Sequence, residues 1–119
     1  MSTILVCGSR DLQPAPWVFD ALDRHIDNDD LVVSGGACGA DEIATRWAMR
    51  NAIRRRVYQA DWASHGKSAG PMRNHRMLRD EKPDLVLAFP GGRGTAHMVR
   101  IARGAGVRVV LVTPEGETE

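Results

Sequence analysis

Glycine-rich loops follow three of the apolar segments of this sequence and are its clearest sign of chemistry. CGSRD runs from 7 to 11, SGGACGAD from 34 to 41, and FPGGRGTAH from 89 to 97. Glycine has no Cβ, so its backbone can approach a ligand closely. A helix that begins directly after such a loop presents unpaired N–H groups and a partial positive charge. Together these features predict a binding site for an anion, most naturally a phosphate.

Polar side chains in and near these loops extend the predicted site. Thr95 has a hydroxyl in the first turn of a predicted helix, and Ser9 and Arg10 can donate from the first loop. The polar segment Asp61–Asn74, DWASHGKSAGPMRN, could fold over the site and bring cations close to a phosphate. The predicted ligand-binding residues are Gly8, Ser9, Arg10, Gly35, Gly36, Gly39, Asp41, Lys67, Arg73, Asn74, Pro90, Gly91, Gly92, Gly94 and Thr95.

Asp41, Arg73 and His97 are the candidates for catalytic roles. Asp41 lies in the first turn of a predicted helix, where it could complement the helix dipole or accept hydrogen bonds from ribose hydroxyls. The planar guanidinium of Arg73 suits a phosphate or a ribose hydroxyl. His97 could act as an acid–base group, although an exposed helical histidine is the simpler interpretation. Trp62 could stack on a base, with core packing as the favoured alternative.

Alternating strand and helix patterns indicate how these loops are positioned. Apolar runs predict five strands, at Thr3–Cys7, Leu31–Ser34, Arg56–Ala60, Leu85–Phe89 and Val107–Val112. Helical periodicity predicts helices near residues 18–26, 40–48, 71–80 and 95–102. This order predicts an α/β fold, a three-layer, doubly wound parallel sheet with strand order 3-2-1-4-5. Strands one, two and four are then neighbours, so their loops line one crevice at the carboxyl edge of the sheet.

The length of 119 residues, of which 43% are hydrophobic, is enough for one domain, expected over residues 1–114. Residues 115–119 are expected to form a frayed polar tail. The net charge of +1 is too small to attract duplex nucleic acid or a membrane surface electrostatically.

No apolar run could span a bilayer, and the N-terminus has no signal-like region, so we expect a cytoplasmic protein. The two cysteines, Cys7 and Cys38, lack CxxC spacing, so we expect reduced, part-buried thiols and no metal site. We also expect that no cofactor is required.

The loops match neither a dinucleotide fingerprint after the first strand nor a P-loop. GSR, SGGACGAD, DWASHGKSAGPMRN and FPGGRGTAH, in this order, instead resemble the YspA/YpsA-related branch of the SLOG superfamily over nearly the whole chain. The resemblance implies a Rossmann-like domain that binds a nucleotide or a nucleotide-derived ligand. That superfamily includes the LONELY GUY phosphoribohydrolases and the DNA-processing proteins.

The phosphate-binding part of the LONELY GUY signature is present, and its acidic residue is not. PGGxGTxxE corresponds to Pro90–Thr95, with Met98 in place of the glutamate. The arginine–lysine pair of those enzymes corresponds to Arg73 and Asn74, so the lysine is also missing. Methionine can hold neither a charge nor a proton, and the resemblance therefore implies the ligand site without the usual catalytic carboxylate.

Three functions remain open. The first is a nucleotide-binding module that acts as a sensor or ligand carrier. The second is a hydrolase that cleaves the N-glycosidic bond of a nucleoside 5′-monophosphate, with Asp41 as its carboxylate. The third, DNA processing, rests on superfamily analogy, and the near-neutral charge and few aromatic residues argue against it. By resemblance to the LONELY GUY enzymes we also expect a homodimer.

Overall fold

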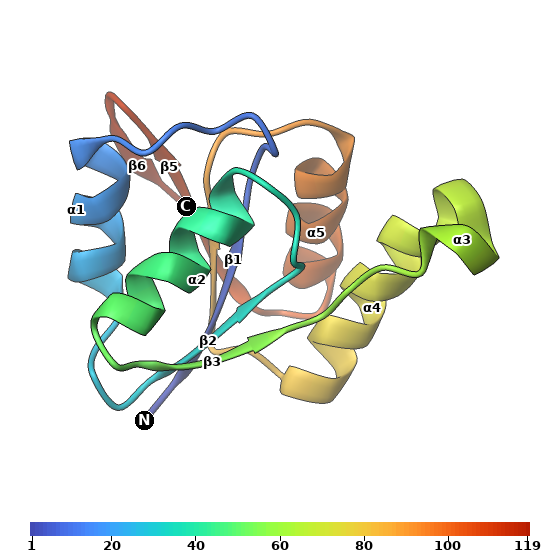
Figure 1. Cartoon of the computed structure of the whole chain (residues 1–119), viewed down its shortest axis with the longest axis horizontal. Coiled ribbons are helices and arrows are strands. Elements are labelled where there is room, and N and C mark those ends of the chain that lie inside the picture. The colour runs from blue at the N-terminus through green and yellow to red at the C-terminus, as the bar shows by residue number, and fades with distance from the viewer.

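Short aliphatic segments form a mostly parallel sheet in the computed structural model, which describes residues 1–119 (Figure 1). Its parallel strands are β1 (Thr3–Cys7), β2 (Leu31–Ser34), β3 (Arg54–Val57), β4 (Leu85–Ala88) and β5 (Arg108–Thr113). The order across the sheet is β3-β2-β1-β4-β5-β6, with β6 antiparallel to β5. The predicted α/β class and the 3-2-1-4-5 order are confirmed.

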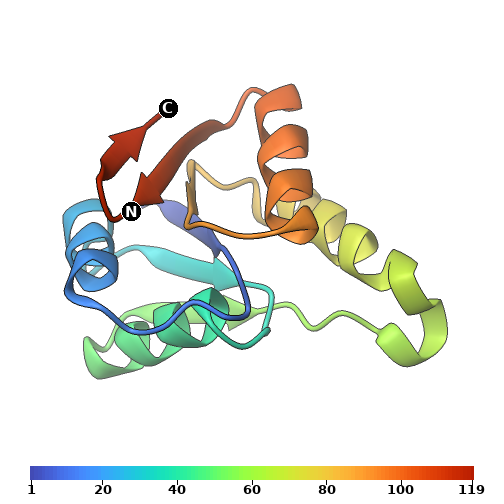
Figure 2. The same cartoon turned by 90° about the horizontal axis from the view of Figure 1, so that it is seen from above.

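Helices cover both faces of the sheet (Figure 2). They are α1 (Pro16–His25), α2 (Ala40–Arg50), α4 (Ala69–Glu81) and α5 (Arg93–Gly104). Successive residues of a strand point to opposite faces. Accordingly, Ile4 and Val6 of β1 pack in the cluster that contains α1 and α2, whereas Leu5 packs with Met77 of α4 and Met98 of α5. None of the helices has both the length and the apolarity that crossing a lipid bilayer requires.

The third strand begins two residues earlier than predicted. The segment Arg56–Ala60 was expected as the strand, but β3 is Arg54–Val57, and all four of its residues are exposed. β3 pairs only with β2 and forms the edge of the sheet, so its side chains need not be apolar. The three consecutive arginines Arg54–Arg56 are therefore exposed to solvent and also supply the backbone of a strand.

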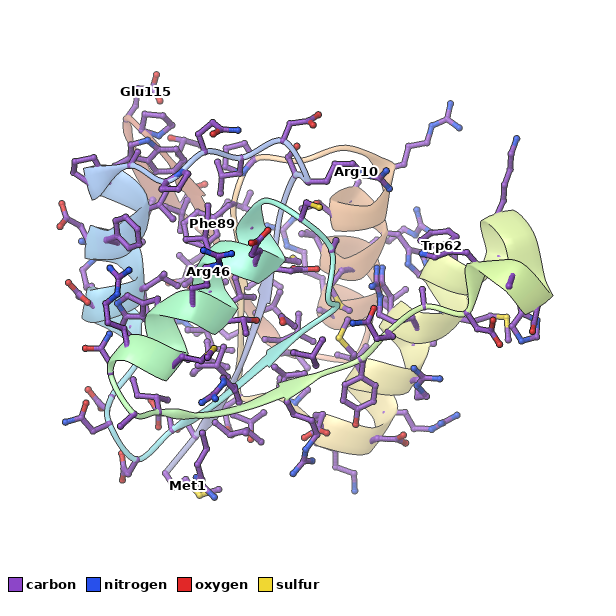
Figure 3. All side chains as sticks on the ribbon, viewed as in Figure 1. Met1, Arg10, Arg46, Trp62, Phe89 and Glu115 are labelled. Carbon is purple, nitrogen blue, oxygen red and sulfur yellow. The ribbon has the colours of Figure 1, made fainter.

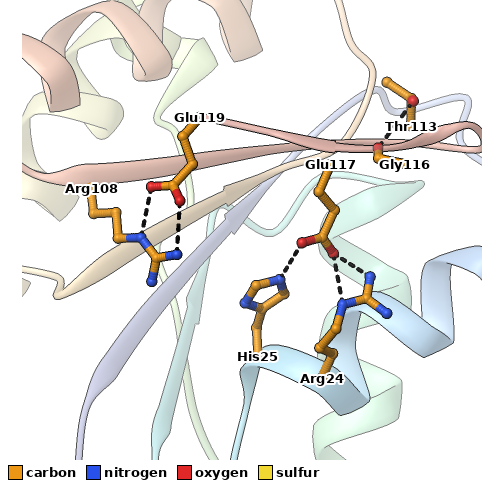
Figure 4. Close-up of polar contacts among 7 residues, drawn as sticks. All are labelled: Arg24, His25, Arg108, Thr113, Gly116, Glu117 and Glu119. Atoms are coloured by element: carbon orange, nitrogen blue, oxygen red, sulfur yellow. Dashed lines mark hydrogen bonds and ion pairs between the residues drawn. The ribbon is translucent and has the colours of Figure 1, made fainter.

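The expectation of a frayed C-terminal tail is wrong. Residues Gly116–Thr118 form β6, which pairs with β5. The Glu117 carboxylate accepts hydrogen bonds from Arg24 and His25 of α1, and Glu119 pairs with Arg108 (Figure 4). Partial burial raises the pKa of Glu117, but the bonds from Arg24 and His25 outweigh this and hold that pKa below its usual value. These partners are distant in sequence, so composition alone could not reveal them.

The polar segment before the fourth strand is helical rather than a loop. It forms α3 (Trp62–His65) and a 3₁₀ turn (Gly66–Ser68) that lead directly into α4. The Asp61 carboxylate caps α3 by accepting a bond of 3.1 Å from the Ser64 N–H. Residues 61–68 are all exposed, and α3 projects away from the sheet (Figures 1 and 2). The segment thus approaches the carboxyl edge of the sheet from the side, as a helical extension of α4, and still brings Lys67 and Arg73 to the cavity there.

Candidate ligand-binding site

The loops after β1, β2 and β4 meet at one cavity of about 850 Å³ at the carboxyl edge of the sheet. The start of α4 and the loop after β3 complete its wall. Figure 3 shows Arg10, which comes from the loop after β1, and Trp62, which comes from α3; both line the cavity. A volume of this size is typical of pockets that hold a small-molecule ligand.

Most of the residues predicted from the sequence line this cavity. They are Gly8, Ser9, Arg10, Gly35, Gly36, Asp41, Lys67, Arg73, Asn74, Gly92, Gly94, Thr95 and His97. Gly39, Pro90 and Gly91 do not line it and instead shape the loops behind it. The Ser9 N–H donates to the Pro90 carbonyl (2.8 Å), and the Ser9 carbonyl accepts from the Ala40 N–H (3.0 Å). These two bonds tie the first loop to the other two.

The N-terminus of α5 is open to an anion. Gly92 is its N-cap, no side chain caps it, and its first turn carries no acidic residue. The start of α2 differs, because Asp41 and Glu42 already lie in its first turn. The unpaired N–H groups and the positive end of the α5 dipole therefore make the start of α5 more favourable for an anion than the start of α2.

The buried Asp41 and the half-buried Arg73 line the cavity with opposite charges and make no direct ion pair. Asp41 is 7% exposed, and its carboxylate accepts from the Ala37 N–H (3.1 Å). Burial raises the pKa of Asp41, and the Ala37 N–H, the charge of Arg73 and the Gly35 N–H only partly offset this. Arg73 donates through Nη1 to the Gly35 carbonyl. Burial lowers the pKa of Arg73, and the charge of Asp41 opposes that change.

Cys7 is half-buried close to this pair, and its surroundings disfavour the thiolate. Burial and the charge of Asp41 raise the pKa of Cys7 to about 12, despite the opposing charge of Arg73. Because the thiolate is the reactive form, a thiol with this pKa is inert at neutral pH. Cys38, in contrast, is exposed at the rim of the cavity. The two cysteines form no disulfide with each other.

Asn74 and His97 connect α4 with α5 at the wall of the cavity. The buried Asn74 amide bonds to Arg73, to the Gly94 carbonyl and to His97 Nδ1. His97 is half-buried and lines the cavity, so its interpretation as an exposed helical histidine is wrong. Burial lowers the pKa of His97, and the charges of His75 and Arg100 lower it further.

Trp62 lies outside the core, whereas Met98 lies within it. Trp62 is 52% exposed, so the favoured expectation of core packing is wrong. Its ring covers Gly70 at the rim, where a Cβ on that glycine would lie 3.1 Å from the ring. Met98 is fully buried in the core between the sheet and the α4–α5 layer and does not line the cavity. The place of the missing glutamate is thus taken by a core residue.

Sequence reasoning missed several lining residues, among them Asp11, Cys38, Gln59 and Arg93. Gln59 follows β3, whose carboxyl end lies at the same edge as the other loops, so the rule that placed those loops could have found it. Arg93 occupies the variable position of PGGxGT and begins α5. Its position in the first turn of the helix that follows the glycine loop could have identified it as a lining residue.

Comparisons with known proteins agree with this architecture. A family model described as "YspA, cpYpsA-related SLOG family" matches residues 2–65. The Gene 61 protein of Mycobacterium phage D29 is 42% identical over 120 residues, covering 92% of this chain and 95% of that protein.

Among solved structures, UDP-GlcNAc 2-epimerase from Neisseria meningitidis, bound to UDP-GlcNAc, is similar with a TM-score of 0.52 and 18% sequence identity. The match covers 93% of this chain but 32% of the epimerase chain, and this likeness concerns the fold alone. It agrees with the Rossmann-like class. The family match over more than half of the sequence and the phage relative lead to one conclusion: the chain belongs to the YspA/cpYpsA-related SLOG family.

Proposed function

We propose that the protein binds a nucleotide or a nucleotide-derived phosphate ligand in the cavity at the carboxyl edge of its sheet. The observation that carries this proposal is the convergence of three glycine loops on one cavity beside the uncapped, acid-free start of α5. An anion is stabilised at such a helix end by backbone N–H groups and by the helix dipole. Arg10, Lys67 and Arg93 line the same cavity and add positive charge.

The remaining lining residues suit the other parts of a nucleotide. Asp41 accepts hydrogen bonds and Arg73 donates them, and because they make no direct ion pair, a sugar hydroxyl can bridge them. Trp62 exposes an aromatic ring at the rim, on which a base can stack.

A matched pair of glycine variants tests the position of the ligand. Gly94 and Gly104 both belong to α5, and a Cβ at either would meet open space. Alanine at each is expected to maintain or raise stability, by up to about 1 kcal/mol, since alanine favours helices. Only Gly94 lines the cavity. We expect Gly94→Ala to weaken nucleotide binding at least tenfold, roughly 1.4 kcal/mol, and Gly104→Ala to leave it unchanged.

Binding is measured by thermal stabilisation and calorimetry with nucleoside monophosphates, ADP, ADP-ribose and NAD. A ligand at 100 times its dissociation constant is expected to stabilise the fold by roughly 2.7 kcal/mol. The proposal fails if no member of the panel stabilises the wild type, or if the two alanine variants bind equally well.

We propose that the protein acts as a sensor or as a ligand-carrying module. The alternative is a hydrolase that cleaves a glycosidic bond, and one observation supports it. The core position of Met98 supports the module. The alternative is supported by Asp41, a buried carboxyl with a raised pKa that lines the cavity, as a general acid or base requires. Release of free base from nucleoside monophosphates, followed by chromatography, distinguishes the two.

Asp41→Asn is expected to abolish any such release while stabilising the fold at neutral pH. The raised pKa means that the folded state holds the Asp41 proton more tightly than the unfolded state, whose value is near 3.8. Wild-type stability therefore falls as the pH rises from that value to the folded pKa. The stability difference between the Asp41→Asn variant and the wild type should grow across this window and vanish in acid. Glu42→Gln, at an exposed neighbouring carboxylate, is the control. A pH-independent difference would contradict this account.

A further inference from the structure

Asn74 is buried at the junction of α4, α5 and the cavity, and both hydrogens of its amide group are engaged. Its Oδ1 accepts from Arg73 Nε at 3.1 Å. Its Nδ2 lies 3.2 Å from the Gly94 carbonyl oxygen and 3.1 Å from His97 Nδ1. Both amide hydrogens are therefore used within the protein, and none is left for a ligand.

The chemistry of these neighbours fixes which way the amide points. Arg73 Nε can only donate, so it must face the amide oxygen, and the Gly94 carbonyl can only accept, so it must face the amide nitrogen. His97 Nδ1 lies on the nitrogen side and must accept the second amide hydrogen. A neutral imidazole that accepts at Nδ1 has its proton on Nε2. The bond network thus selects one tautomer of His97.

The surroundings of His97 also favour its neutral form. The His75 ring from α4 lies edge-on at 5.1 Å between centroids, and Arg100 lies on α5 itself. Arg73 reaches the same amide from the other side. No carboxylate is hydrogen-bonded to the ring. A second proton on Nδ1 would meet the Asn74 amide hydrogens.

We propose that Asn74 is a positioning residue that holds His97 as the Nε2–H tautomer and orients the guanidinium of Arg73. The side chains of His97 and Arg73 then offer only hydrogen-bond donors to the cavity. This wall of the cavity, between α4 and α5, would therefore bind a second oxyanion. The bond from Arg73 Nη1 to the Gly35 carbonyl leaves N–H groups of Nη2 without a protein partner. His97 lies about one helical turn, roughly 5.4 Å, beyond the start of α5. This inference rests on the proposed function, in which the first phosphate lies at the start of α5. The ligand class becomes a nucleoside diphosphate or a diphosphate-linked nucleotide.

The first test is the tautomer of His97 in the ligand-free protein, read from its ¹⁵N chemical shifts by NMR and assigned with His97→Gln. We expect the proton on Nε2 in the wild type. In Asn74→Asp, a carboxylate faces His97, and the proton should move to Nδ1 with a rise in the pKa of the ring. Asn51→Asp, at an amide that bonds only the Trp47 carbonyl, should change neither. An Nδ1 proton in the wild type, or no change in Asn74→Asp, would overturn the positioning role.

The second test compares the affinities for ADP and AMP. The wild type should bind ADP about tenfold more tightly, and in His97→Phe, which has no donor at this position, this ratio should fall towards one. Equal affinities in the wild type would overturn the oxyanion subsite while leaving the proposed function intact. Absence of binding by both nucleotides would overturn the subsite, and the proposed function would fall with it only if ADP-ribose, NAD and the other nucleoside monophosphates also fail to bind. The tautomer would still decide the role of Asn74.

Discussion

Replacing Gly39 with alanine is expected to destabilise the fold by about 3 kcal/mol or more and to abolish nucleotide binding. Gly39 has a φ of +68°, and a Cβ there would overlap the backbone of Ser9 and Arg10. Neither side of that contact is a flexible side chain, so the loops themselves would have to move. The Ser9 carbonyl accepts from the Ala40 N–H, and its displacement would separate two of the three loops of the cavity.

Gly106→Ala is the matched control for this prediction. Gly106 has a φ of +77°, similar to that of Gly39, but a Cβ at this position would meet open space. Its replacement should therefore show the conformational strain alone, about 1–2 kcal/mol, with ligand binding unchanged. Urea denaturation measures both free energies. Equal losses for the two variants would show that the close approach of the loops is not what requires Gly39.

The layer order and the meeting of the loops could be predicted because both depend on local patterns. Apolar runs such as Leu85–Ala88 identify buried parallel strands, and alternation with helices leaves few topologies. Since every parallel strand ends at the same edge, glycine loops after neighbouring strands must converge. The position of the cavity therefore follows from the strand order, which the spacing of apolar residues in the sequence predicts.

The features that escaped prediction depend on side chains far apart in sequence. Glu117 bonds to Arg24 and His25, which lie 93 and 92 residues earlier in the sequence. These bonds help to hold the C-terminal residues in a strand, where the sequence predicted a frayed tail. The bond between Asn74 and His97 arises from the packing of α4 on α5, which no local pattern encodes. Trp62 is exposed because α3 extends α4 outwards, and four residues of helix are too short to give a periodic signal.

Replacing Arg73 with methionine is expected to weaken nucleotide binding by about 10- to 100-fold, since hydrogen bonds to charged groups contribute roughly 1.5–3 kcal/mol. It should also lower stability at neutral pH, because the partly compensating charge beside the buried Asp41 is lost and the Gly35 carbonyl loses its donor. Arg76→Met is the control. Arg76 lies one turn along α4 on the exposed side, over the Tyr58 ring at 5.3 Å, and does not line the cavity.

A double-mutant cycle separates the two roles of Arg73. In Arg73→Met with Asp41→Asn, no unpaired buried charge remains, so stability at neutral pH should return towards that of Asp41→Asn alone. Ligand affinity should stay low, because the guanidinium that donates to the ligand is still absent. Isothermal calorimetry and urea denaturation on the four proteins provide the cycle. Recovery of binding together with stability would mean that Arg73 acts only by balancing Asp41, and that the ligand makes no direct contact with it.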